Sequence, residues 1–254
     1  MSATIRVTAV SAVAAAVLSS LATAPGAVAA AGQTVRLTPL SSHRLVVSPD
    51  GRIKNSTSSN WDGYSATGSS FTSVSASWVQ PSVTCTSTAY SSFWIGIDGD
   101  GSNSVEQTGS EADCSGRTAR YYSWYEMYPA YPVNYSDPVS AGDHFTSTVS
   151  TNGSGSFTLV LSDTTKGWTH TTTKTSTTAS LASAEVIAEA PSSSSGVLPL
   201  AHFTTAAFTN ATANGQPIGT YGPDQINMAS GSTTKATTSA LSGGNAFSVT
   251  WNHS

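Results

Sequence analysis

This chain of 254 residues is poor in charge, cysteine and histidine, and each shortage excludes some chemistry. Charged residues make up only 9% of it, so we expect no nucleic-acid partner. Its two cysteines and five histidines form no H-E-x-x-H motif and no paired cluster, which argues against a catalytic zinc. Because G-x-S-x-G is also missing, a Ser-His-Asp hydrolase is not expected. We expect neither metal nor cofactor.

The sequence also argues against two further kinds of acidic site. Pepsin-like chemistry needs two Asp-Thr/Ser-Gly turns, and neither Asp98-Gly99 nor Asp163-Thr164 begins one. The run from Asp98 resembles the start of an EF-hand loop, but Asn103 stands where Gly is needed. Gly109 stands where the bidentate Glu would fall. A tight turn is the better interpretation.

Long apolar runs are confined to the N-terminus. Arg6 precedes an apolar stretch over 7–21, and Ala27-Val28-Ala29 offers a small-residue cleavage site. The stretch is too short and too rich in Ala and Ser to span a bilayer. We therefore predict a signal peptide over residues 1–30, a secreted protein and no membrane segment.

The segment 31–54 differs in charge from the rest. It holds four basic residues and one acid, whereas residues 55–254 hold five basic and thirteen acidic residues. A basic leader before an acidic domain fits a removable pro-segment held partly by charge, and acid would weaken that attraction. A flexible tether is the alternative interpretation.

The remainder, residues 55–254, predicts one all-β domain. Short runs rich in Thr, Val, Tyr and Phe alternate with Gly, Pro, Asn and Ser clusters, which is typical of an antiparallel sandwich. The expected strands are 60–66, 70–79, 91–97, 104–108, 118–127, 144–150, 156–162, 167–173, 184–190, 200–209, 219–221, 225–228 and 246–251. In an exported protein Cys85 and Cys114 are expected to form one disulfide, worth about 3–4 kcal/mol in the chain-entropy model.

Three segments carry candidate chemistry. The apolar run 93–97 meets an Asp-Gly turn and returns through 104–109, which predicts a hairpin that forms one wall of a cleft. On the strand 121–128, period two places Tyr122, Trp124, Glu126 and Tyr128 on one face. That pattern suits a cleft lining, and aromatic core packing is the alternative.

The third segment is the strand 184–190. It turns Glu185, Ile187 and Glu189 to one side, so two carboxylates share a face that is otherwise apolar. In a chain so poor in charge this arrangement suggests a site, and an ordinary solvated face is the alternative.

Together these segments resemble the glutamic peptidases, or eqolisins. The resemblance rests on five motifs in the family's order over 60–211, namely NWDGY, FWIGIDGDG with EQTG, WYEMYP, AEVIAE and LPLAHF with AFTNA. It implies a jelly-roll sandwich of two antiparallel sheets, about seven strands each, with the active site on the concave face. It also implies a secreted proenzyme that cleaves proteins or peptides in acid and is insensitive to pepstatin.

The resemblance also assigns site residues. Gln107 of Q-T-G and Glu189 of A-E-x-x-x-E would be catalytic. Five others would line the cleft: Trp94, Asp98, Glu111, Trp124 and Glu126. The chain departs from the family at Met127, where Trp is common, and at Val186, where an aromatic is usual, which bears on subsite preference.

The chemistry can be argued from the residues themselves. An ionised Glu189 can take a proton from water and return it to the leaving nitrogen, while the Gln107 amide stabilises the oxyanion. Two alternatives stay open at this point. One is a jelly-roll glycosidase using Glu185 and Glu189, although positions four apart on a strand lie roughly 13 Å apart. The other is a non-catalytic carbohydrate-binding sandwich. In every case we expect a monomer.

Overall fold

The computed structural model describes residues 55–254, and every regular element except one short 3-10 helix is a β-strand. The proposed signal peptide over 1–30 and pro-segment over 31–54 lie outside the described residues. The first ten strands are β1 (Ser56–Ser58), β2 (Trp61–Thr67), β3 (Ser73–Val79), β4 (Val83–Thr84), β5 (Ser92–Ile97), β6 (Val105–Ser115), β7 (Thr118–Tyr128), β8 (Val133–Asn134), β9 (His144–Thr151) and β10 (Ser156–Asp163). The others are β11 (Trp168–Thr175), β12 (Ser183–Glu189), β13 (Ser192–Ser193), β14 (Gly196–Val197), β15 (His202–Phe203), β16 (Ala206–Ala213), β17 (Gln216–Pro217), β18 (Asp224–Ser230), β19 (Thr233–Thr238) and β20 (Phe247–Trp251).

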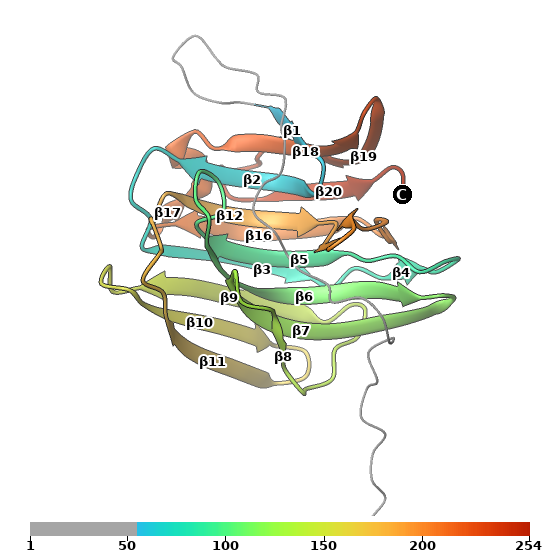
Figure 1. Ribbon diagram of the computed structural model, residues 1–254, viewed down its shortest axis with the longest axis horizontal. Coiled ribbons are helices and arrows are strands. Elements are labelled where there is room, and N and C mark those ends of the chain that lie inside the picture. Colours follow the sequence, from blue (N-terminus) through green and yellow to red (C-terminus); the bar gives the residue numbers. More distant parts are fainter. Residues whose placement is uncertain (1–54) are drawn as a thin grey trace, which may run out of the picture. The chain divides into compact units, whose positions relative to one another are not determined.

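The strands form a sandwich, as the sequence predicts (Figure 1). Hydrogen bonds link them in the order β11-β10-β9-β3-β16-β20-β19-β18-β2-β12-β5-β6-β7-β8. The two halves of this path face one another, since β5 contacts β3 and β9, and β12 contacts β16. The expected pair of sheets is therefore one continuous sheet of 16 strands, whose two halves form the two layers.

The core lies between the layers and follows from the period-two pattern. Along β10 the residues Phe157, Leu159 and Leu161 are buried, and the partly exposed Ser156, Thr158, Val160 and Ser162 alternate with them. Trp78 and Phe145 stack from neighbouring strands, with ring centroids 5.5 Å apart. In contrast, β5 and β12 are buried along their whole length on both faces.

The expected disulfide is present and joins Cys85 to Cys114 with 5.4 Å between their Cα atoms. Cys114 lies near the end of β6, where its backbone pairs with Ala89 in an isolated bridge. The bond therefore ties the segment that precedes β5 to the far end of β6.

The short strands β1, β4, β8, β13, β14 and β17 were not predicted, and the strand expected over 104–108 continues to Ser115. Three further differences concern longer segments. Residues 219–221 lie in the 3-10 helix η1 (Ile218–Tyr221), which follows Pro217 and ends at Gly222 in a left-handed conformation at φ 59°. The predicted strand 200–209 is divided, because β15 and β16 are separate elements. Strand β19 was not predicted, since its sequence TTKATT has no apolar alternation, and it is held by pairing with β18 and β20.

Candidate active site

The face of β2, β12, β5, β6 and β7 that is turned away from the core gathers most of the predicted site residues. Strand register sets them in rows. One row runs Trp61–Glu189–Ser92–Glu111–Tyr122, the next Gly63–Ile187–Trp94–Gly109–Trp124, and the third Ser65–Glu185–Gly96–Gln107–Glu126. Because side chains alternate along a strand, all three rows point to this same face.

Glu189, at the end of β12, accepts a hydrogen bond on each carboxyl oxygen. Trp94 Nε1 donates to Oε2 at 3.0 Å, and Asn60 Nδ2 donates to Oε1 at 3.2 Å. The Trp94 ring is held edge-on by Trp61, with ring centroids 5.1 Å apart. The carboxyl group of Glu189 is thus buried and oriented by two N–H groups. That Asn60 would be one of the two donors was not predicted from the sequence.

Gln107 lies on the same face, in the middle of β6. Its Nε2 donates to Glu126 Oε2 on the adjacent strand at 2.7 Å, which orients the amide. Its Oε1 is buried and has no hydrogen-bond partner among residues 55–254. Beside it Gly96 contributes no side chain, and a Cβ there would come within 3.1 Å of Gln107 Cβ. One N–H and the carbonyl oxygen of Gln107 therefore remain for another molecule.

Gln107 and Glu189 are brought to one face but stand in different rows. Strand β5 separates their strands, and the row of Trp94 and Gly109 separates them along the strand direction. The missing side chain of Gly109 allows β6 to lie this close to Trp94 on β5. A Cβ at position 109 would lie 2.4 Å from Phe93 O and 2.5 Å from Trp94 Cβ. The indole of Trp94 thus lies between the two polar groups.

Beside Glu189, Glu111 and Asp113 form a pair of buried acids on β6. Burial raises the pKa of Asp113 to about 7, and hydrogen bonds from the Tyr122 hydroxyl at 2.9 Å and Ser91 N at 3.2 Å act against that rise. Burial raises the pKa of Glu111 well above its usual range, and the charges of Asp113 and Glu189 raise it further. In acid this pair is protonated; near neutral pH it gains negative charge.

At the opposite end of the face, Glu185 is fully buried. Neither of its carboxyl oxygens makes a hydrogen bond of normal length, and burial raises its pKa well above the usual range. On the core-facing side of β6, burial likewise raises the pKa of Glu106 to about 7. The sequence marked Glu185 by its place beside Glu189 on an apolar strand, but no sequence signal separated Glu106 from an ordinary surface carboxylate.

The structure places Asp98 apart from the other predicted cleft residues. It follows β5 at φ 68°, and its carboxylate accepts the backbone N–H groups of Ser180, Leu181 and Ala182 at 2.8–3.0 Å. In this position Asp98 anchors the segment that leads into β12. Asp100 Oδ2 in the same turn accepts from Ser65 Oγ at 2.7 Å.

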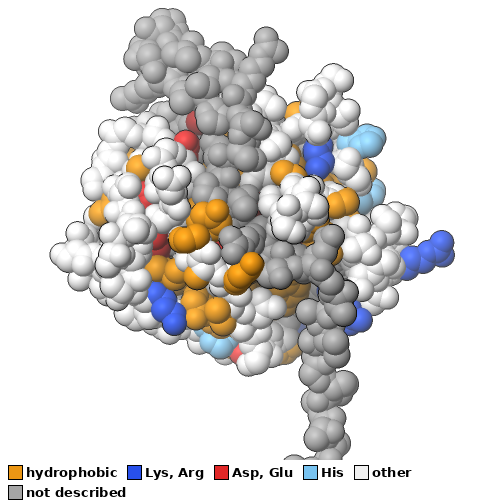
Figure 2. All heavy atoms as spheres, in the orientation of Figure 1, with side chains coloured by type: hydrophobic (Ala, Val, Ile, Leu, Met, Phe, Trp, Pro, Cys, Tyr) orange, Lys and Arg blue, Asp and Glu red, His pale blue; other side chains and the backbone are white. Residues whose placement is uncertain are grey.

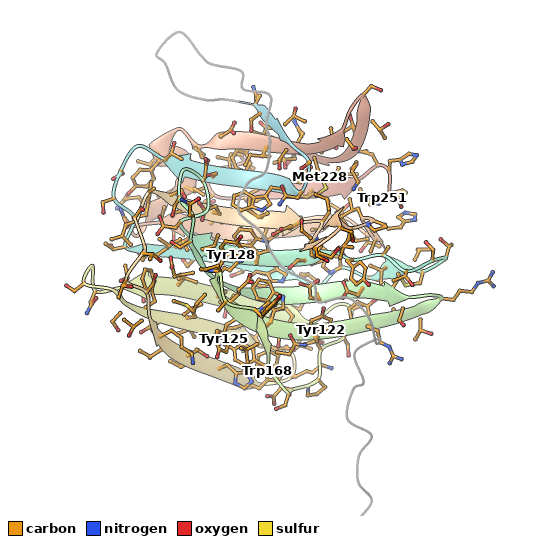
Figure 3. The ribbon with its side chains drawn as sticks, in the orientation of Figure 1. Tyr122, Tyr125, Tyr128, Trp168, Met228 and Trp251 are labelled. Atoms are coloured by element: carbon orange, nitrogen blue, oxygen red, sulfur yellow. A yellow bond between two sulfur atoms is a disulfide. The ribbon has the colours of Figure 1, made fainter. Side chains whose placement is uncertain are left out.

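A hollow of about 360 Å³ adjoins the end of β7. It is lined by Met127 to Ala130 on one side and by Thr175 to Thr178 on the other. Tyr122 and Tyr128 mark the two ends of the aromatic face of β7 (Figure 3). Outside the region drawn in grey, the face of the molecule in Figure 2 carries few charged side chains.

Comparison with known proteins identifies the family of this chain. Residues 59–251 match the family model described as the Peptidase A4 family. Aspergillopepsin-2 of Aspergillus niger is 29% identical over 205 residues, covering 70% of this chain and 73% of that protein. Scytalidopepsin B of Scytalidium lignicola is 38% identical over 105 residues, covering 40% of this chain and 39% of that protein. A crystal structure of scytalido-glutamic peptidase with a transition state analog inhibitor matches with a TM-score of 0.66 at 27% identity, over 76% of this chain and 98% of that one.

Proposed function

The chain belongs to the Peptidase A4 family of glutamic peptidases, and on that premise we propose that it cleaves peptide bonds in acid through Gln107 and Glu189. It is an endopeptidase acting on proteins or peptides, which argues against the alternatives of a glycosidase and of a carbohydrate-binding sandwich. The observation that supports the proposed dyad is that hydrogen bonds hold each of its two side chains in place. Glu189 is held by Asn60 and Trp94, and Gln107 is held by Glu126, on one face.

The proposed reaction needs no group beyond these and a water molecule. Glu189, as carboxylate, takes a proton from water, whose oxygen attacks the carbonyl carbon of the scissile bond. The Gln107 N–H that does not bond to Glu126 stabilises the oxyanion. Glu189 then gives its proton to the amide nitrogen as the carbon–nitrogen bond breaks, and the carboxylate is regenerated. We expect no cofactor.

The acid working range follows from the neighbouring carboxyls. Glu111, Asp113 and Glu185 keep their protons in acid, because burial raises the pKa of each. As the pH rises through about 7, the Glu111–Asp113 pair gains charge beside Glu189. Like charges at close range oppose one another, so we expect activity to fall toward neutral pH.

The hollow lined by Met127 and Tyr128 lies directly beyond Glu126 on β7, and we propose that it receives a substrate side chain. With Met at position 127 instead of the Trp common in the family, this hollow is expected to accept a longer side chain. Trp124, whose Nε1 is buried and has no partner in the described part of the chain, is expected to donate to the bound peptide.

We also propose that the protein is a secreted monomer, made with the signal peptide and pro-segment predicted from the sequence. In residues 55–254 no helix is long and apolar enough to cross a membrane. Processing is expected to stop before Ser56, because its N–H and hydroxyl both bond to Asp224 and hold β1 in parallel pairing with β18. Mass spectrometry of the mature N-terminus tests this boundary.

The function is tested by cleavage of a denatured protein from pH 2 to 7 with pepstatin present. We expect acid activity in the wild type, a loss of about 10²–10⁴-fold in Glu189→Gln, and a loss of about 10²–10³-fold in Gln107→Ala. Asn210→Asp, a change on the exposed part of β16, serves as the control and should cleave normally. Full activity in both site variants would exclude the dyad.

A further inference from the structure

The side-chain amide of Asn60, between β1 and β2, has an orientation that its contacts determine. Ser58 Oγ donates to Asn60 Oδ1 at 2.9 Å, and the same hydroxyl oxygen accepts the backbone N–H groups of Asn60 and Trp61 at 3.2 and 3.1 Å. Because the carbonyl end of the amide receives the Ser58 hydroxyl, the Nδ2 end is directed to Glu189 Oε1, 3.2 Å away. The amide is therefore presented to Glu189 as a donor.

The backbone places this donor next to Glu189. Asn60 O accepts the N–H of Ala190 at 2.8 Å, and Trp61 stands opposite Glu189 in the β2–β12 register. Asn60 thus binds β12 by its backbone just past Glu189 and by its side chain at the carboxyl group. Asn60 and Glu189 are both fully buried, so the contact is not weakened by competition from bulk solvent.

We infer that Asn60 is a positioning residue that keeps Glu189 ionised and correctly oriented in acid, and that Ser58 sets its amide for this task. The inference rests on the proposed role of Glu189 as the base. An N–H donor bonds more strongly to a carboxylate than to a carboxylic acid, so donors on both oxygens favour the ionised form. Trp94 Nε1 supplies the second donor.

These donors act against the burial of Glu189, which disfavours its charged form, and against any charge on the acids that face it. Glu111 on β6 interacts with Glu189 through its charge, and Asp113 is coupled to Glu111. Glu185 on β12 itself and Glu126 on β7 point to the same face. On this face β1, β2 and β5 present no ionisable side chain in the described part of the chain. Since these acids keep their protons in acid, it is burial that would favour a protonated Glu189 without the two N–H donors, and a protonated Glu189 cannot take a proton from water.

The test is the pH dependence of kcat/KM for the processed enzyme with Asn60 and Ser58 replaced. In Asn60→Ala we expect the acid limb to move up by about one pH unit, so that kcat/KM at pH 3 falls about tenfold while activity near the optimum falls less. Ser58→Ala should shift the limb in the same direction by a smaller amount. Asn210→Asp is the matched control, and its profile should superimpose on that of the wild type.

A second readout follows the carboxyl itself. With ¹³C-labelled Glu carboxyls, the Glu189 resonance is identified by its loss in Glu189→Gln, and its titration midpoint should rise in Asn60→Ala in step with the acid limb. An unmoved limb, or a uniform fall in kcat/KM at every pH, would overturn the inference. If the wild type shows no acid cleavage, the proposed function fails instead, and the NMR titration still decides whether Asn60 favours the ionised carboxylate.

Discussion

At Gly109 the backbone of β6 passes beneath Trp94, and the missing side chain is what allows the two strands to approach. A Cβ would lie 2.4 Å from Phe93 O and 2.9 Å from Trp94 Cα, both backbone atoms that cannot rotate away. Since Trp94 donates to Glu189, this single position links β5–β6 packing to the site. Steric crowding therefore explains why the third position of the Q-T-G motif is a glycine.

We predict that Gly109→Ala displaces Trp94 and lowers both stability and activity. The strand must shift, so the free energy of unfolding should fall by about 1–3 kcal/mol, as for other overpacked interiors. Urea unfolding and kcat/KM measure the two effects. Gly116→Asn is the control, because position 116 has open space around it and φ 62°, which Asn tolerates. Wild-type values for both quantities in Gly109→Ala would contradict the steric argument.

At the scale of elements, the segment that leads into β12 is attached to the end of β5 by one side chain. Asp98 accepts three consecutive backbone N–H groups, and this contact precedes the strand that carries Glu185 and Glu189. The resemblance to the family placed Asp98 in the cleft. In the structure its carboxylate instead sets where β12 begins relative to β5.

We predict that Asp98→Ala destabilises the protein by about 3 kcal/mol, because three N–H groups lose a charged acceptor. Hydrogen exchange at Ser180, Leu181 and Ala182 should accelerate, whereas exchange in β10 should change less. Asp98→Asn keeps one acceptor oxygen and should lie between Asp98→Ala and the wild type. If hydrogen exchange at residues 180–182 stayed slow in Asp98→Ala, Asp98 would not be the residue that anchors the segment leading into β12.

For the molecule as a whole, the buried carboxyls decide how stability depends on pH. Asp62 accepts from Met228 N at 2.8 Å and from the Thr238 hydroxyl, yet burial raises its pKa from 3.8 to about 7. Burial also raises the pKa of Glu106 to about 7. When the pKa of an acid is higher in the folded state, the fold binds more protons than the unfolded chain between the two values. The stability that Asp62 and Glu106 contribute is thus fully present below about pH 4 and is lost as the pH rises through about 7.

We therefore predict a free energy of unfolding that is highest near pH 3–4 and falls by several kcal/mol up to pH 8, of which Asp62 contributes roughly 4 kcal/mol. Urea unfolding at each pH measures it. In Asp62→Asn the fall should be smaller, since the amide can accept from Met228 N and stays uncharged. Asp137→Asn, a change in the partly exposed pair with His170, is the control. Stability that rose from pH 4 to 8 would contradict this assignment.

Some of this could be predicted from the sequence. Period-two alternation and turn residues indicated the all-β sandwich and most strands, because those signals are local. Two cysteines in a chain predicted to be exported indicated the disulfide that the structure contains. The order of five motifs indicated the family that the comparisons establish.

Tertiary structure alone decided the rest, since contacts between distant segments leave no local pattern. Strand β19 forms through its neighbours and not through its own composition. Asn60 and Glu189 are 129 positions apart in the chain, and only the β2–β12 register brings the amide to the carboxyl. The raised pKa values of Asp62, Glu106 and Asp113 arise from burial, which depends on how the whole sandwich packs. The sequence determined which residue types carry the chemistry, and the fold determined the surroundings in which each one ionises.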